Sequence, residues 1–264
     1  MDSFEDVGFI SSETDQFEEK IKKAIPAHYN YLLKMNRFSQ NIQYKLKIHI
    51  NDTDELISAI LFTRTLSTYQ AFILISKRGM VSQTKMLLRC MFEPLFPLIA
   101  ISKHKDYSKK LIGSEEHERL KAFNKLLRFH RRENPNDPLI EEIKQKAKEV
   151  KEKIAKKNFK KISVAQAAED AGLISWYDTA YSLLSNTVHS SVRSLEEALD
   201  LDGEKNLRAL KNEPGLDEFD HLYATAIEAM LYANIAIANI FGIDIEKFSK
   251  EIYNKIKEFV KEDA

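Results

Sequence analysis

The stretch that decides the fold is NDTDELISAILFTRTLSTYQAFILISKRG, residues 51–79. Its apolar residues recur three and four positions apart, which is the spacing of one face of an α-helix. The segment from Asn51 to Asp54 offers an N-cap with acidic residues in the first turn, and Gly79 follows two basic residues as a C-terminal stop. A second apolar helix over 80–104 begins at once. The short connection therefore predicts an antiparallel helical hairpin over 52–104.

Helical periodicity extends over most of the remaining chain, and no segment shows convincing strand alternation. We expect a helix over 13–49 with an interruption at Pro26, and another over 173–199. A loop is expected over 202–219. Two final helices, 217–241 and 244–262, are expected to meet at Gly242.

These patterns predict an all-α protein, a multi-helix bundle built from antiparallel hairpins. Glycine (7) and proline (6) are scarce, which favours long helices over turn-rich β architecture. The length of 264 residues is compatible with a single domain. Its expected parts are an N-terminal helix (1–50), the core hairpin (52–104), a basic helical arm (105–172) and C-terminal core helices (173–264).

The arm carries most of the charge asymmetry. The formal net charge is zero, yet residues 119–161 hold 15 Lys and Arg against 6 Asp and Glu. Such a patch can attract an anionic partner such as RNA, whereas the alternative is a solvated helical surface without a partner. The candidate nucleic-acid contacts are Arg128, Arg131, Arg132, Lys153, Lys156 and Lys157.

Composition indicates a folded, cytoplasmic protein. Hydrophobic residues make up 44% and charged residues 30% of the chain. The single cysteine, Cys90, lies in an apolar run and is expected to be a small core residue in a reducing compartment. Residues 223–243 are long and apolar enough to raise a membrane question, but Glu228, Asn234 and Asn239 favour a helix buried in protein. We therefore expect no membrane association.

Charged residues interrupt the apolar stretch LLRCMFEPLFPLIAI, residues 87–101. Arg89 and Glu93 lie one helical turn apart, and a buried arginine requires a partner, for which Glu93 is nearest. Pro94 and Pro97 each remove a helical N–H, so a kink with spare carbonyl acceptors is expected beside the pair. The stretch thus predicts a polar site within a helical core.

A second polar cluster lies on the expected 173–199 helix. Tyr181, Ser185, His189 and Arg193 follow one another at four-residue intervals and form one stripe. An apolar stripe runs beside it: Tyr177, Leu184, Val188, Val192 and Leu195. If the two clusters face each other, all six polar residues form one candidate catalytic site. The alternative is a set of satisfied packing residues and an ordinary helical ion pair.

Several sequence motifs that identify enzyme classes are absent. The chain has no GxxxxGK[ST], GxGxxG, GxSxG or HExxH motif. Its seven histidines are scattered, and no set of His, Cys, Asp and Glu has zinc-site spacing. The sequence thus predicts neither a metal nor a cofactor.

The order of these segments resembles a known bacterial family. TRTLSTYQAFILISKRGMVSQTKMLLRCMFEPLFPLIAI, a lysine-rich middle and YSLLSNTVHSSV together resemble the domain-of-unknown-function family 5677, over about residues 52–240. The resemblance implies helical hairpins with an R-x-x-x-E signature, here Arg89 and Glu93. It also implies a Y-x-x-x-S-x-x-x-H signature, here Tyr181, Ser185 and His189.

A broader similarity is to the HEPN helical proteins of bacterial defence and toxin systems. Their ribonucleases carry R-x4-6-H on one helix. This chain has no arginine four to six residues ahead of any histidine, and His189 precedes Arg193 in the reverse order.

Three functional hypotheses are compatible with the sequence. The first is an interaction or effector module of a bacterial stress or phage-defence system, forming a homodimer or binding a partner protein. The second is a metal-independent ribonuclease in which His189 is the general base and Arg89 or Arg193 stabilises the developing charge. The third is a sensor that binds a small molecule between the helical hairpins.

Overall fold

The predicted hairpin is the centre of the fold. The computed structural model describes residues 2–188, 196, 198–203 and 205–262. Helix α4 (Thr53–Ser76) and helix α5 (Val81–Lys103) pack antiparallel. The side chain of Asp52 accepts a 3.0 Å hydrogen bond from the backbone N–H of Glu55, as an N-cap does. Gly79 adopts a φ of +73° in the turn, a left-handed conformation that a residue without a Cβ tolerates.

Helix α12 (Phe219–Phe241) completes the core by packing against α3 (Pro26–Gln43), α4 and α5. It is long and apolar enough to span a membrane by length and composition, but 61% of its most apolar window is buried inside the protein. Helix α13 (Glu246–Glu262) then folds back, and the Phe248 ring stacks on Phe38 of α3 at 3.4 Å between ring centres. The apolar C-terminal segment is therefore a core helix of this bundle.

The helix predicted over 13–49 with an interruption at Pro26 corresponds to two helices that are separated at Ile25, and short elements precede them. The N-terminal segment comprises α1 (Phe4–Val7), η1 (Gly8–Ile10), η2 (Ser12–Gln16) and α2 (Phe17–Ala24) before α3. Pro26 is the first residue of α3, where its missing N–H has no helical partner to lose. Helix α3 ends at Gln43, six residues before the expected end, because residues 44–51 find little core to pack against.

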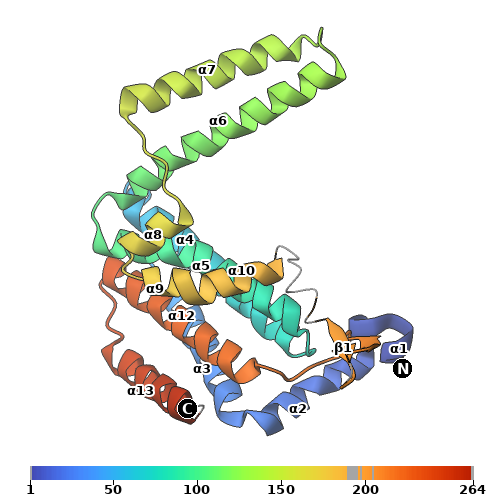
Figure 1. The fold of residues 1–264 in the computed structure, drawn as a ribbon. Helices are drawn as coiled ribbons and strands as arrows, with labels where there is room; N and C mark the ends of the chain where they lie inside the picture. The colour runs from blue at the N-terminus through green and yellow to red at the C-terminus, as the bar shows by residue number, and fades with distance from the viewer. Residues whose placement is uncertain (1, 189–195, 197, 204, 263–264) are drawn as a thin grey trace.

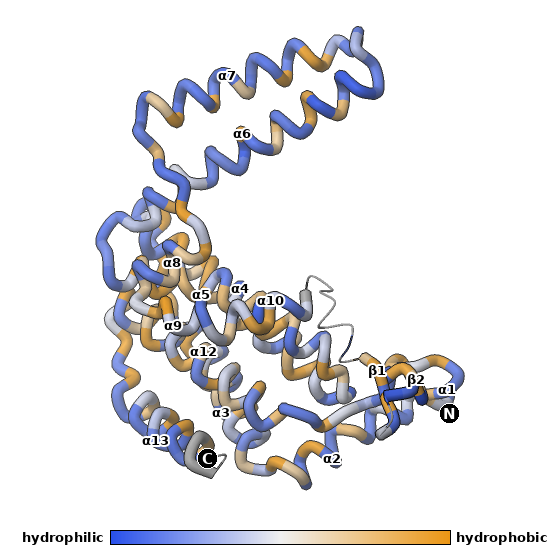
Figure 2. The backbone as a smooth tube through the Cα atoms, in the orientation of Figure 1, coloured by the Kyte–Doolittle hydropathy of each residue, from blue (hydrophilic) through white to orange (hydrophobic). Residues whose placement is uncertain are grey.

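The basic segment forms an arm that projects from the bundle (Figure 1). We define the arm as α6 (Tyr107–Glu133) and α7 (Leu139–Lys157), which form an antiparallel hairpin. Hydrophilic residues dominate both helices (Figure 2), and their own small core contains Leu127, Ile140 and Ala147. The arm therefore holds itself together with few apolar contacts and exposes most of its charges.

The first turn of α6 is fixed in the bundle. Asp54 of α4 accepts hydrogen bonds from the backbone N–H groups of Asp106 at 2.9 Å and Ser108 at 3.2 Å. Tyr107 is buried, and its hydroxyl donates to Asp170 at 2.7 Å. Asp170 ends α8 (Val164–Asp170), which returns the chain to α5.

A short strap, residues 158–163, holds the base of the arm. The ring of Phe159 covers Gly113 so closely that an added Cβ would lie 2.5 Å from Phe159 Cδ1. Ser114 Oγ accepts from the backbone N–H of Ile162 at 2.8 Å, and His117 Nε2 lies 2.9 Å from the Phe159 carbonyl oxygen. Glycine at 113 is thus required by a close approach.

The segment after α8 is helical over residues 174–188, as predicted, but its helix contains a π-helical turn. It consists of α9 (Ile174–Trp176), the π-helical turn η3 (Tyr177–Tyr181) and α10 (Ser182–Val188) without a break, and most of the remaining residues of the expected helix lie outside the described ranges. Two short antiparallel strands follow, β1 (Leu199–Leu201) just before the expected loop and β2 (Leu207–Leu210) within it, with Leu199 opposite Leu210. Strands of three and four residues are too short to produce a recognisable alternation in the sequence.

Candidate polar site between α5 and α10

Arg89 joins α5 to the segment containing η3 and α10. Its Nε donates to Ser185 Oγ at 3.1 Å, one terminal nitrogen donates to Tyr181 OH at 2.8 Å, and the other to Glu93 Oε1 at 3.0 Å. The structure therefore brings together four of the six residues that the sequence singled out. We call Arg89, Glu93, Tyr181 and Ser185 the polar site.

The π-helical turn positions Tyr181 at this contact. A π-helical turn inserts an extra residue into the helical spacing and changes the direction of the side chains that follow it. Ser182 Oγ donates to the Tyr177 carbonyl at 2.7 Å, and the rings of Tyr177 and Tyr181 stack with centres 5.1 Å apart. Tyr181 is buried, with its ring 4.7 Å from the Arg89 guanidinium carbon.

The polar site lies at the edge of the core. The Arg89 side chain is 13% exposed and the Glu93 side chain 42% exposed, so the ion pair has one buried and one solvated partner. Cys90, expected in the core, is exposed beside them because it lies on the outward face of α5. That prediction was wrong, and an apolar run in the sequence did not reveal which face it occupies.

Burial raises the pKa of the Tyr181 hydroxyl, while the nearby Arg89 charge opposes the shift and the Glu93 charge adds to it. The tyrosine is therefore neutral at physiological pH and accepts the Arg89 hydrogen bond through its hydroxyl oxygen. Ser185 Oγ in turn donates to the Tyr181 carbonyl at 2.8 Å. The site is thus a continuous chain of hydrogen bonds from Glu93 to the backbone of the π-helical turn.

His189 and Arg193 lie outside the described residues, as do Val192 and Leu195 of the expected apolar stripe. Tyr177 and Leu184 pack against the main core, as that stripe predicted. Among the ranges that the structure describes, no group of three or more His, Cys, Asp and Glu side chains is placed to hold a metal ion.

The six candidate nucleic-acid contacts are all exposed on the arm, but they differ in their partners. Lys153 pairs with the buried Glu116 of α6, and Arg132 pairs with Glu133 at 2.9 Å. Lys157 lies 5.8 Å from the ring centre of Phe159. Arg128, Arg131 and Lys156 form no ion pair within the described part of the arm. Lys153 is therefore a structural contact.

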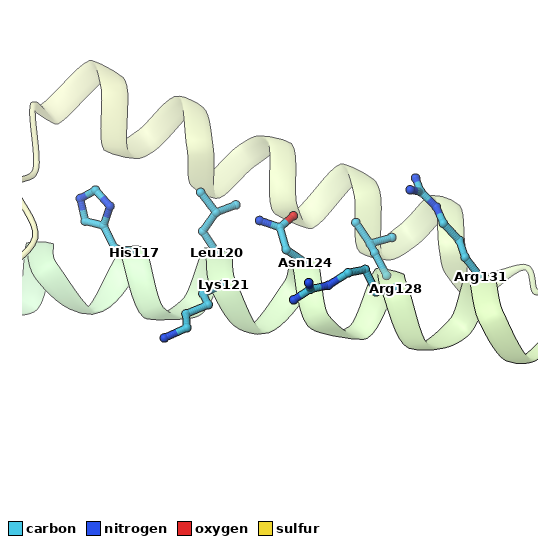
Figure 3. A pocket seen from close by; sticks show the side chains of 7 residues that line it. His117, Leu120, Lys121, Asn124, Arg128 and Arg131 are labelled. Atoms are coloured by element: carbon cyan, nitrogen blue, oxygen red, sulfur yellow. The ribbon is translucent and has the colours of Figure 1, made fainter.

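A groove of about 570 Å³ runs along α6 (Figure 3). The sequence analysis identified Arg128 and Arg131 but not the other residues that line the groove. The only sequence signal for His117, Lys121 and Asn124 is their spacing of three and four positions, which places them on one face of a helix. The residues that line the groove are His117, Leu120, Lys121, Asn124, Leu127, Arg128 and Arg131.

Comparison with protein-family models gives one match. The model of a family of unknown function, DUF5677, matches residues 55–207, more than half of the chain. The chain belongs to the DUF5677 family. The DUF5677 match begins in α4 and ends in β2, so it includes the hairpin, the arm and the polar site. It is shorter at the C-terminal end than the sequence resemblance indicated, and α12 lies outside it. No curated protein and no solved structure matches the chain.

Proposed function

We propose that this DUF5677 protein is a non-enzymatic, all-α interaction module in which the polar site is a structural joint. The observation that carries the proposal is the use of the Arg89 donors. All three of its nitrogen atoms donate to side chains of the protein itself, and the side chain is only 13% exposed. An arginine that stabilised a reacting group would direct its donors toward a substrate.

The arm is the surface that we propose for the partner. It projects from the bundle, and its local excess of basic residues favours an anionic partner. Its rows of intrahelical ion pairs, such as Lys146 with Glu142 at 2.6 Å, neutralise part of this charge. Arg128, Arg131, Lys156 and Lys157 are exposed and form no such pair within the described arm. These four residues are the candidates for partner contact.

Binding to a general polyanion tests the proposal. We would measure retention on immobilised heparin for the whole protein and for a variant with Arg128, Arg131, Lys156 and Lys157 all changed to Glu. The control changes four exposed lysines outside the arm to Glu: Lys23, Lys45, Lys47 and Lys105. We expect the arm variant to elute at much lower salt than the control. Equal elution of the two variants would contradict a binding role for the arm.

A metal-independent ribonuclease is the second candidate. The observation in its favour is that Tyr181 and Ser185 both contact Arg89, and His189 follows Ser185 by four residues in the sequence. Incubation with total RNA would compare the protein with His189→Ala. Cleavage that disappears in the variant would replace the non-enzymatic proposal with this one.

The biological setting that we propose is a bacterial stress or phage-defence system, with the module acting as a homodimer or bound to a partner protein in the cytoplasm. The setting rests on the sequence resemblance to HEPN proteins of such systems, whose R-x4-6-H motif this chain lacks. Mass measurement by light scattering would test the homodimer directly.

A further inference from the structure

The groove on α6 combines an apolar floor with basic walls. Leu120 and Leu127 are its apolar lining residues, and Leu120 packs against the core of the arm in which Leu127 is buried. His117, Asn124 and Arg131 extend toward α7, whereas Lys121 extends away from it and Arg128 lies along α6 (Figure 3). The groove therefore offers hydrogen-bond donors and positive charge along one side of a straight helix.

The positive charge in the groove is largely uncompensated. Lys121 Nζ lies 3.3 Å from Glu118 Oε2, and both side chains are about half exposed. An ion pair in contact with solvent is weak, so it compensates the lysine charge only in part. Arg128 and Arg131 form no ion pair within the described chain. A guanidinium presents five N–H donors in a fixed fork that fits the oxygens of a phosphate. Two such forks one turn apart suit a partner with repeated phosphates.

The length of the groove also suits an extended polyanion. Lys121 and Arg131 are ten positions apart, which is roughly 15 Å along the axis of an α-helix. A single phosphate or a mononucleotide would occupy only part of that length. A strand with regularly repeated phosphates could contact Lys121, Arg128 and Arg131 together.

An exposed aromatic ring lies on α6 outside the residues that line the groove, about 100° around the helix from Arg128. Phe129 is 51% exposed, and the guanidinium carbon of Arg132 lies 5.9 Å from its ring centre. Leu126, one turn before it on the neighbouring face, is also exposed. Free bases stack on exposed aromatic and guanidinium surfaces, whereas the bases of a duplex are already stacked on one another. This feature favours an unpaired strand over a double helix.

We propose that the groove of α6 binds the sugar-phosphate backbone of a single-stranded nucleic acid, with Arg128 and Arg131 on the phosphates and Phe129 against a base. This inference rests on the proposed role of the arm and names its partner. Lys121 and Asn124 contribute further donors, whereas the Nε2 of His117 is already in contact with the Phe159 carbonyl oxygen. Lys153 is excluded, because it pairs with Glu116 at the base of the arm.

Fluorescence anisotropy tests this proposal with a 15-nucleotide oligouridylate, the matching oligothymidylate and an RNA duplex of the same length. The variants are Arg128→Glu with Arg131→Glu, Phe129→Ala, and a control with Lys45→Glu and Lys47→Glu, which are exposed residues of the loop after α3. Circular dichroism establishes that each variant is folded. The whole protein is used throughout.

We expect the groove variant to lose at least about ten-fold in affinity for single strands and the control to bind like the unchanged protein. Three phosphate contacts give a slope of about −2 in log K against log salt for a single strand, and losing two of them lowers its magnitude by about 1.4. Phe129→Ala is expected to weaken single-strand binding several-fold and leave duplex binding unchanged.

Three results would overturn the inference. The first is equal affinity of the groove variant and the control. The second is a duplex that binds as tightly as the single strands with no effect of Phe129→Ala. The third is retention on heparin through the arm without binding of any oligonucleotide, which would leave the proposed interaction module intact. Failure to bind heparin as well would contradict the proposed function itself.

Discussion

The Arg89 guanidinium donates a 2.8 Å hydrogen bond to the Tyr181 hydroxyl and lies 4.7 Å from the centre of the same ring. These two residues are 92 positions apart, and the whole arm lies between them in the sequence. The contact therefore links the helix before the arm to the helical segment after it. With the bonds to Ser185 and Glu93, it makes Arg89 the one side chain of the polar site that contacts all the others.

Arg89→Ala is expected to lower the free energy of unfolding by about 2 kcal/mol, because it removes charge-assisted hydrogen bonds from a mostly buried position. Arg89→Lys should recover little of this, since one ammonium cannot reach three partners on two elements. Chemical denaturation measures both. Arg64→Ala, on the exposed face of α4, is the matched control and should have an effect below about 0.5 kcal/mol.

A double-mutant cycle of Arg89→Ala with Tyr181→Phe separates the pair from its surroundings. We expect a coupling energy between the two substitutions. Strictly additive effects would mean that the hydroxyl contact contributes nothing to stability.

Asn234 is a second buried polar residue, and its substitutions separate the effect of lost hydrogen bonds from the effect of a buried charge. Its Nδ2 donates to Ser39 Oγ and to the Met230 carbonyl, both at 2.8 Å, while its Oδ1 is buried without a hydrogen-bond partner in the described chain. Asn234→Asp replaces the donor with a carboxylate in a fully buried position and is expected to destabilise by about 4 kcal/mol. Asn239→Asp, on the exposed side of α12, should change stability little.

Asn234→Leu is expected to be much less harmful than Asn234→Asp, because it removes the unpaired oxygen together with the donor. The reverse order in thermal denaturation would show that the hydrogen bonds outweigh the burial of a charge at this position.

The substitution Gly113→Ala is expected to destabilise the protein when the Phe159 ring is present and to stabilise it when that ring is absent. Gly113→Ala places a Cβ 2.5 Å from the Phe159 ring, and overpacking of this kind costs about 1–3 kcal/mol. In a Phe159→Ala background the same substitution should stabilise by up to about 1 kcal/mol, because alanine is the better helix former. Gly203→Ala, whose added Cβ would meet no atom within 4 Å, is the control.

Hydrogen exchange locates the effect of Gly113→Ala. We expect faster exchange of the Ile162 amide, which donates to Ser114 beside the displaced ring. Unchanged exchange there would mean that the strap adjusts without losing its contact to α6.

Glu228 should make stability depend on pH. Burial in α12 raises its pKa in the folded protein, with a smaller opposing effect from Tyr232. A raised pKa means that the folded state binds the proton more tightly than the unfolded state, so protonation stabilises the fold. Glu228→Gln is therefore expected to be more stable than the unchanged protein at pH 7–8. The gain should shrink as pH falls through the folded pKa and vanish below the usual glutamate range.

Thermal denaturation between pH 4 and pH 8 measures this difference. The exposed Glu213→Gln serves as the control and should show no comparable trend. A gain for Glu228→Gln that is the same at all pH values would point to packing and not to ionisation.

The long helices were predictable because each carries enough residues to reveal a period. The α4–α5 hairpin has both end signals in the sequence, Asp52 before the first turn and Gly79 in the connection. The π-helical turn at 177–181 and the strand pair were not predictable. A π-helical turn depends on tertiary contacts such as the Tyr181–Arg89 bond, and strands of three or four residues carry too little pattern.

The polar site was predictable in part for a related reason. Helical spacing alone pairs Arg89 with Glu93 and Tyr181 with Ser185, because each pair is one turn apart. The two pairs meet because α10 packs on α5. No local sequence pattern specifies this packing. The exposure of Cys90 was missed since an apolar run contains outward-facing positions as well as inward-facing ones.

Helix α6 is unbroken from the buried Tyr107 to Glu133, a length of roughly 40 Å for its 27 residues. Its root is held by Asp54, which belongs to the first turn of α4. An unbroken helix that is anchored at one end can carry a displacement of its tip to that end. A partner bound near the tip would therefore act through this root on α4, the helix that begins the central hairpin.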